Sequence, residues 1–251
     1  MSRQQNVMTR LSVNVNKVAT LRNTRDVGVP SVLRAATICL DAGAQGITVH
    51  PRPDQRHIRP ADVYELAELL KSHPDVEFNI EGNPFIEYMQ YAKAVRPRQC
   101  TLVPDAPEAA TSDHGWDLKR DARRLEPVIR QLKDLGCRVS LFMDAGVQGL
   151  ELARQIGADR VELYTAGYAE RFAHDDGDAA APYTQTARQA QDLGLGVNAG
   201  HDLNLHNLSP FLRAVPNVLE VSIGHALIAD ALEFGLASTV RKYLAACAAT
   251  A

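Results

Sequence analysis

DLKRDARRLEPVIRQLKDLGCRVSLFMD, residues 117–144, contains two different patterns in succession. Between Asp117 and Leu135 the apolar side chains recur every three or four positions, which predicts a helix with one apolar face. Residues 138–144 form a short run of apolar and β-branched side chains, which predicts a buried strand. Gly136 lies between the two and suits a left-handed helix end. The segment therefore predicts a helix that packs on the sheet to which the following strand belongs.

The same short apolar runs occur at other places along the chain, and helical segments such as residues 63–70 and 85–95 lie between them. Helices between strands favour right-handed crossovers and a parallel sheet. A closed barrel of eight such strands usually takes about 250 residues. The sequence therefore predicts a single α/β domain over residues 1–251, a (β/α)8 TIM barrel. The predicted strands are residues 11–16, 46–50, 77–81, 100–104, 138–144, 160–165, 196–201 and 219–225.

Long segments rich in glycine, proline, aspartate and arginine follow several predicted strands, whereas the connections from helix to strand are short. In a (β/α)8 barrel the loops that follow the strands build the catalytic face. We therefore expect extra loop and helix elements, and the functional site, at the C-terminal face. The long loops are residues 17–30, 51–60, 105–115 and 167–182, and the expected helix-end glycines are Gly43, Gly136, Gly157 and Gly194.

The composition argues against several classes of protein. Lys and Arg number 27 and Asp and Glu number 30, a net charge of −3, so no strong attraction to nucleic acid is expected. The chain has no run of about 18 apolar residues, and its first residues, MSRQQNVMTR, lack the apolar block of a secretory signal. A cytoplasmic protein without a membrane partner is expected. The cysteines lack C-x-x-C spacing and are predicted to be structural: Cys39, Cys100, Cys137 and Cys247.

Polar and ionisable side chains concentrate where the predicted strands end. An inward-pointing charge needs partners or a ligand to offset its desolvation, so this ring is the main functional signal. Histidine and glutamate can transfer protons near neutral pH. His50, His201 and Glu81 could alternatively hold zinc, although no H-x-H or H-E-x-x-H spacing is present. The ring consists of Asn14, Asn16, His50, Glu81, Asp144, Glu162, His201 and His225.

Two regions suit phosphate. The first is PRPDQRHIRP, residues 51–60, whose arginines can bind phosphate oxygens bidentately. The second comprises the glycine-containing turns NAGHD, residues 198–202, and SIGHA, residues 222–226, which precede helical segments and offer backbone N–H groups to an anion. Two separate regions indicate two phosphorylated ligands. No G-x-G-x-x-G or Walker motif supports a nucleotide cofactor.

Seven motifs follow one another along nearly the whole chain: SVNVNKVATLRNTR (12–25), GITVHPRPDQRHI (46–58), EFNIEGNP (77–84), TLVPDAPEAATSDHGWD (101–117), VSLFMDAG (139–146), NAGHDL (198–203) and SIGHALI (222–228). Together they resemble the pyridoxine 5′-phosphate synthase family. The resemblance implies a (β/α)8 barrel that condenses 3-amino-2-oxopropyl phosphate with 1-deoxy-D-xylulose 5-phosphate. The products would be pyridoxine 5′-phosphate, phosphate and water, without a metal or an organic cofactor. It also implies a homo-oligomer, an octamer.

The resemblance also implies roles for individual residues. It implies that His50 and Glu81 are the first and second proton acceptors. His201 would be the proton donor, and Glu162 would stabilise the transition state. Residues 105–115 match the family's closing lid. The implied contacts to the amino ketone phosphate are Asn14, Arg25, Asp202, Gly224 and His225, and those to the deoxyxylulose phosphate are Arg52, His57 and Thr111.

Two places depart from the family pattern. Asn16 and Lys17 stand where many members have Asp-His in contact with the pentulose, so Lys17 could instead reach a phosphate. Asp202 stands where many members have glycine, and its carboxylate could repel a phosphate. These departures leave a non-catalytic phosphosugar-binding paralogue as one alternative to the synthase. A metal-dependent barrel aldolase or hydrolase is the other.

Overall fold

The computed structural model describes residues 8–109 and 111–249 and shows a closed barrel of eight parallel strands. Each strand pairs with the next along the chain, and the last pairs with the first, so that Leu11 lies beside Val221. The predicted TIM barrel and its eight strands are confirmed. The strands are β1 Arg10–Asn14, β2 Gly46–Val49, β3 Glu77–Gly82, β4 Gln99–Leu102, β5 Arg138–Met143, β6 Arg160–Tyr164, β7 Gly196–Gly200 and β8 Val218–Ile223.

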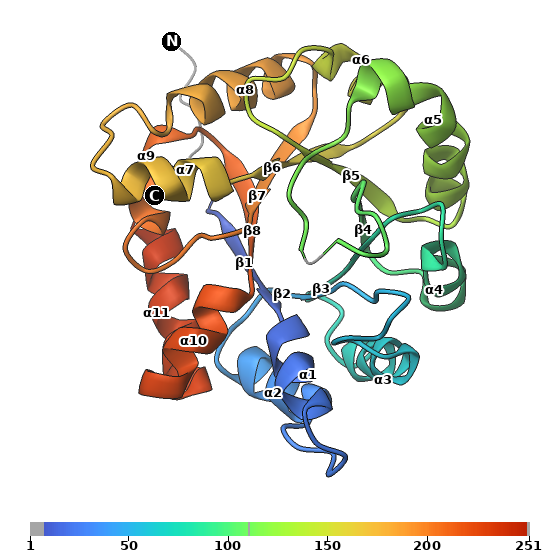
Figure 1. Ribbon diagram of the computed structural model, residues 1–251, viewed down its shortest axis with the longest axis vertical. Helices are drawn as coiled ribbons and strands as arrows, with labels where there is room; N and C mark the ends of the chain where they lie inside the picture. The colour runs from blue at the N-terminus through green and yellow to red at the C-terminus, as the bar shows by residue number, and fades with distance from the viewer. Residues whose placement is uncertain (1–7, 110, 250–251) are drawn as a thin grey trace.

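The helices surround the strands on the outside of the barrel (Figure 1). In the helix predicted from residues 117–135, Leu125, Ile129 and Leu132 are fully buried, as the apolar period requires. The predicted helix-end glycines all have positive φ values. The helices are α1 Asn16–Asn23, α2 Val32–Asp41, α3 Pro60–Leu70, α4 Tyr88–Val95, α5 Leu118–Asp134, α6 Leu150–Gln155, α7 Ala166–Ala173, α8 Ala181–Asp192, α9 Leu208–Ala214, α10 His225–Phe234 and α11 Leu236–Ala248.

Two of the predicted long loops contain helices. Strand β1 ends at Asn14 rather than at Asn16, because the Asn14 side chain accepts a hydrogen bond from the Asn16 backbone N–H at 3.0 Å and turns the chain into α1. Lys17 therefore lies in a helical turn and not in a loop. Helix α7 likewise occupies part of the predicted loop 167–182. Both helices lie directly after strands, so they are the extra elements expected at the C-terminal face.

The helix predicted at residues 85–95 begins later in the structure than its apolar pattern indicates. Phe85 and Ile86 precede α4 and are 41% and 38% exposed. The side chain of Asn83 accepts a hydrogen bond from the Phe85 backbone N–H at 3.0 Å, which forms a turn in place of the first helical turn. The prediction that the helical segment starts at residue 85 is therefore wrong, since α4 begins at Tyr88.

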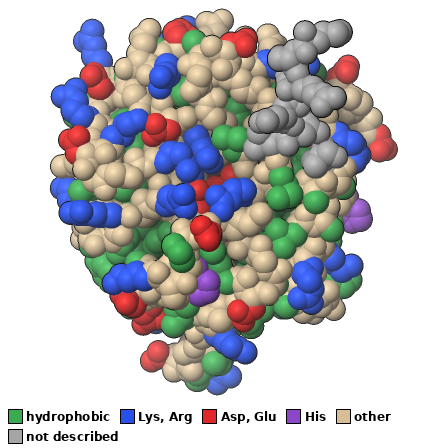
Figure 2. Space-filling view, turned by 180° about the vertical axis from the view of Figure 1, so that it is seen from behind, with side chains coloured by type: hydrophobic (Ala, Val, Ile, Leu, Met, Phe, Trp, Pro, Cys, Tyr) green, Lys and Arg blue, Asp and Glu red, His purple; other side chains and the backbone are tan. Residues whose placement is uncertain are grey.

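The interior of the barrel is polar, while the apolar core lies between the strands and the helices. Hydrogen bonds join Ser12 to Thr48 at 2.7 Å, Asn79 to Thr48 at 3.3 Å, and Thr101 to Asn79 at 3.0 Å. The view from behind shows Lys and Arg side chains gathered with acidic ones near the middle (Figure 2). The hydroxyl and amide groups of Ser12, Thr48, Asn79 and Thr101 thus pair with one another inside the barrel, which offsets their desolvation.

The four cysteines are buried as thiols, in agreement with a structural role. Within residues 8–109 and 111–249, none of the helices is long and apolar enough to cross a membrane. Residues 1–7, which make up most of the N-terminal stretch MSRQQNVMTR, lie outside the described residues.

Candidate active site

A cavity of about 530 Å³ opens where the strands end, and every strand of the barrel contributes to its lining at or near its C-terminal end. The predicted site residues line it except for Asp144 and for Arg25, which is exposed after α1. Sequence positions far apart therefore converge on one space. The predicted residues in the lining are Asn14, Asn16, Lys17, His50, Arg52, His57, Glu81, Thr111, Glu162, His201, Asp202, Gly224 and His225.

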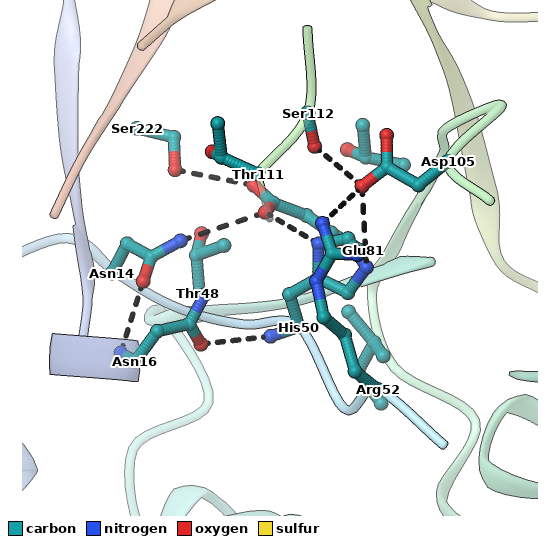
Figure 3. Close-up of polar contacts among 12 residues, drawn as sticks. Asn14, Asn16, Thr48, His50, Arg52, Glu81, Asp105, Thr111, Ser112 and Ser222 are labelled. Carbon is teal, nitrogen blue, oxygen red and sulfur yellow. Dashed lines mark hydrogen bonds and ion pairs between the residues drawn. The ribbon is translucent and has the colours of Figure 1, made fainter. Parts of the chain in front are cut away.

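His50 follows β2 and is held between two carboxyl groups (Figure 3). Its backbone N–H donates to the Asn16 side chain at 3.0 Å. Its ring atoms Nδ1 and Nε2 lie 3.8 Å from Glu81 Oε2 and 3.9 Å from Asp105 Oδ2. Burial, and then the positive charge of Arg52, hold the pKa of His50 well below its usual value. His50 is therefore neutral at neutral pH and can accept a proton.

Glu81 lies at the end of β3, and its carboxyl group faces Nδ1 of His50. Asn14 Nδ2 and Ser222 Oγ lie within 3.5 and 3.4 Å of its two oxygens. Burial, and then the charge of Asp105, raise the pKa of Glu81 to about 8. The side chain can thus lose or take up a proton near the working pH.

Glu162 lies on β6 and is 3% exposed. Thr101 Oγ1 donates to its Oε2 atom at 3.5 Å. Burial, and then the charge of Glu81, raise the pKa of Glu162 well above its usual value. A Cβ atom at Gly200 would come within 2.6 Å of Oε1, so glycine on the neighbouring strand leaves the space for this side chain.

His201 follows β7 and is held by two polar side chains. Its Nε2 atom lies 3.1 Å from Thr111 Oγ1, and its Nδ1 atom lies 3.0 Å from Asp202 Oδ2. The ring also packs edge-on against Tyr164 at a centroid distance of 4.9 Å. His201 and Asp202 have φ values of 84° and 57°, a region that favours glycine. The Asp202 carboxylate therefore contacts the imidazole directly.

The two glycine-containing turns lead into different structures. Gly224 is the N-cap of α10, so SIGHA presents a helix N-terminus to the cavity as predicted. NAGHD does not, because the next helix, α9, begins only at Leu208. The helix predicted to follow NAGHD is therefore present but begins away from the cavity, since the chain first makes the two left-handed residues His201 and Asp202.

The cationic side of the cavity comes from residues 51–60 and from α1. Arg52 forms an ion pair with Asp105, and it and Arg56 donate to the Ala109 carbonyl at 3.0 and 2.9 Å. Burial, and then the charge of Arg52, lower the pKa of His57 to about 4, so its ring is neutral. Lys17 adds a further positive charge to the lining.

Several polar residues near the site were not predicted, and Thr20 in the cavity lining is one of them. Asp105 directly follows the strand predicted at residues 100–104, so the strand-end signal that selected Asp144 could also have selected it. Ser112 donates to Asp105 Oδ2 at 2.7 Å and lines the cavity. Ser222, a small residue within the apolar strand β8, gives no comparable signal.

Asp144 has a structural role instead of lining the cavity. Its carboxylate accepts a hydrogen bond from the Gly115 backbone N–H at 3.1 Å. A Cβ atom at Gly115 would lie 2.4 Å from the Asp144 backbone nitrogen, and the next residue, Trp116, donates from its indole to the Leu102 carbonyl at 2.8 Å. This end of the 105–115 segment is therefore fixed to the barrel.

The described part of the chain contains no group of three or more His, Cys, Asp or Glu side chains arranged to hold a metal ion. His50 and Glu81 approach each other, but His201 is not joined to them as a third ligand. The zinc set considered from the sequence is not assembled.

Comparisons with known proteins identify the family of this chain. A profile of the family described as pyridoxal phosphate biosynthesis protein PdxJ matches residues 11–249. The pyridoxine 5′-phosphate synthase of Albidiferax ferrireducens is 57% identical over 242 residues, which cover 94% of this chain and 96% of that protein. That of Xanthomonas campestris pv. campestris is 56% identical over 245 residues, which cover 94% and 95%.

A solved structure of 3-keto-L-gulonate-6-phosphate decarboxylase from Vibrio cholerae aligns with a TM-score of 0.60 over 95% of this chain and 97% of that one. Its sequence identity is 9%, so this likeness concerns the barrel fold alone. The sequence relatives, in contrast, match this chain over nearly its whole length, including the segments that line the cavity. The chain therefore belongs to the PdxJ family and is an enzyme of the pyridoxine 5′-phosphate synthase type, in vitamin B6 biosynthesis.

Proposed function

We propose that the cavity condenses 3-amino-2-oxopropyl phosphate with 1-deoxy-D-xylulose 5-phosphate to give pyridoxine 5′-phosphate, phosphate and water. The observation that carries the proposal is the pair His50 and Glu81, 3.8 Å apart, in a cavity with two regions suited to phosphate. A volume of about 530 Å³ is in the range of small-molecule sites and suits two short phosphorylated substrates.

The reaction joins an amine to a ketone with loss of water, eliminates phosphate and closes a ring, and each step moves a proton. Neutral His50 accepts the first proton, and Glu81 accepts the second after it has ionised. His201, held by Thr111 and Asp202, donates a proton. Glu162 stabilises charge that develops deeper in the barrel. Holding both substrates in one cavity supplies the proximity that the condensation needs.

The two phosphate-binding regions accept different substrates. The amino ketone phosphate binds at the start of α10, where Gly224 and His225 lie beside Asn14. Asp202 and Arg25 complete this set, although Arg25 lies outside the present lining. The deoxyxylulose phosphate binds opposite, at Arg52, His57 and Thr111, with Asn16 and Lys17 in place of the usual Asp-His pair.

We propose further that the chain works as one domain over residues 1–251, without a metal or organic cofactor, in a homo-octamer. Exposed apolar side chains at Leu21, Val27 and Val29, on the same segment as Arg25, support assembly through this region. The four buried thiols suit the reducing cytoplasm, which is the proposed location.

The test is a steady-state assay of the purified protein with both substrates, following product absorbance and phosphate release. Phosphate should appear only when both substrates are present. Binding of either substrate without phosphate release would favour the non-catalytic paralogue. Turnover that a chelator abolishes would favour the metal-dependent class.

A further inference from the structure

Asp105 connects three parts of the site. It lies after β4, is 3% exposed, and its Oδ2 atom is in contact with Arg52, Ser112 and His50. Arg52 forms the ion pair, Ser112 donates at 2.7 Å, and His50 Nε2 lies 3.9 Å away (Figure 3). One carboxylate oxygen therefore lies next to the proposed phosphate-binding residue Arg52, to Ser112 of the 105–115 loop and to the proposed proton acceptor His50.

This arrangement costs stability. The other carboxylate oxygen, Oδ1, is buried and has no hydrogen-bond partner among the described residues. Burying an ion pair already costs desolvation energy, and an unpaired buried acceptor adds to that cost. A group retained at such a cost next to a reactive histidine is better explained by its effect on the histidine than by folding.

The position of Asp105 also selects a tautomer of His50. Glu81 faces Nδ1 and Asp105 faces Nε2, so the two carboxyl groups lie on opposite sides of one ring. At neutral pH Glu81 is protonated and presents no charge to Nδ1, so the Asp105 carboxylate favours the ring hydrogen on Nε2, the atom that it faces. The separations of 3.8 and 3.9 Å exceed hydrogen-bond length, so this selection acts through charge.

We propose that Asp105 is a positioning residue of the condensation, which fixes His50 as the Nε2–H tautomer and holds Arg52 in place for the pentulose phosphate. Ser112 couples this function to the 105–115 segment, because it shares the same oxygen atom of Asp105. The proposal rests on the proposed function of His50 and Arg52.

The charge of Asp105 has a second, measurable consequence at Glu81. The charged groups that influence Glu81 are Asp105 after β4, Glu220 on β8 and Arg52 after β2, with His50 and Glu162 also adjacent. Because the negative charge of Asp105 raises the pKa of Glu81, its removal should move the ionisation of Glu81 to lower pH.

The first measurement is independent of turnover. Nitrogen-15 NMR of the labelled protein, with the His50 signals assigned from H50Q, should show the Nε2–H tautomer in the wild type. D105N should give a mixture of tautomers, and D105E should keep the wild-type one. An unchanged tautomer in D105N would overturn the proposal even if the enzyme turned over both substrates normally.

The second measurement is the pH dependence of kcat for wild type, D105N, D105E and S112A. D105N should lower kcat by about 10- to 100-fold, raise the KM for the pentulose phosphate and shift the profile to lower pH. D105E should have the pH profile of the wild type. S112A, the matched control, should also keep the wild-type pH profile, because the charge of Asp105 remains. A D105N profile that coincides with wild type, or a D105E profile that resembles D105N, would overturn the proposal.

These outcomes separate the two proposals. Absence of wild-type turnover with both substrates would count against the proposed function, while the tautomer measurement would still decide the role of Asp105. If D105N does not fold, the comparison of R52A with R52A/D105N replaces it, because removing both charges leaves neither partner buried alone. A mixture of tautomers in R52A/D105N but not in R52A supports the contact with His50, and the Nε2–H tautomer in both variants would overturn that part.

Discussion

The Nδ1 atom of His201 lies 3.0 Å from Oδ2 of Asp202, and both residues adopt a left-handed backbone conformation. A non-glycine residue in this region costs of the order of 1 kcal/mol. The contact to His201 gives a reason for an aspartate at a position that glycine would occupy with less strain.

Asp202→Gly should therefore lower kcat several-fold and leave the melting temperature unchanged or higher. The substitution relieves the backbone strain at φ 57° but removes the group that orients the proton donor. Thermal unfolding and steady-state kinetics measure the two effects. Asp202→Asn is the control, since it retains the shape and loses the charge. A kcat for Asp202→Gly equal to wild type would refute the orienting role.

His50→Ala or Glu81→Gln should reduce kcat by about 100-fold or more, because each removes a group that transfers a proton. Both side chains face the cavity, so the fold should remain intact. Circular dichroism confirms folding, and the two-substrate assay measures the rate. A wild-type rate in either variant would exclude that residue from the mechanism.

The raised pKa of Glu81 also predicts how stability depends on pH. Its value is about 8 in the folded protein and 4.5 in the absence of burial, so the folded state retains a proton that the unfolded state loses between these values. The contribution of Glu81 is full below pH 4.5 and is lost as the pH rises toward 8. This pH-dependent contribution should be absent in Glu81→Gln. Urea unfolding of the wild type and of Glu81→Gln across this pH range measures the difference between their free energies of unfolding. That difference would stay constant if Glu81 titrated normally.

Gly200→Ala should lower kcat with a smaller effect on KM. Its Cβ atom would come within 2.6 Å of Glu162 Oε1 and would displace that side chain. Gly177→Ala is the control, because a Cβ atom there meets nothing within 4 Å. Equal rates for the two variants would show that the position of Glu162 does not matter for turnover.

The buried ion pair between Arg22 and Asp62 should contribute to stability. Arg22 also donates to the His57 carbonyl at 3.2 Å, so the pair joins α1 and α3 to the 51–60 loop. Asp62→Ala should lower the free energy of unfolding by about 3–5 kcal/mol, because it leaves a buried charge alone. Glu68→Ala breaks an exposed ion pair with Lys71 and should change the free energy of unfolding by less than about 1 kcal/mol. Similar values for both would contradict the argument.

The barrel could be predicted from the sequence because its strands are short apolar runs and its long helix has a regular apolar period. The site could be predicted in part because a parallel barrel brings all strand ends together, so that His50, Glu81 and His201 share one cavity. Helix α1 was not predicted because it is short and most of its residues are polar, and because it follows a turn formed by the Asn14 side chain.

Asp105 shows why the rest could not be predicted. Its charge became informative only when its neighbours in space, Arg52 and His50, were known. Similarly, the contact between Asp202 and His201 depends on two positive φ values that no composition rule indicates for these residues.

The two ends of the 105–115 segment are attached by different kinds of interaction. At Gly115 and Trp116 the backbone lies against β5 so closely that no side chain fits between them. At Asp105 the attachment consists of polar groups that a phosphate could compete for. Any swing of this segment must therefore pivot about its tryptophan end.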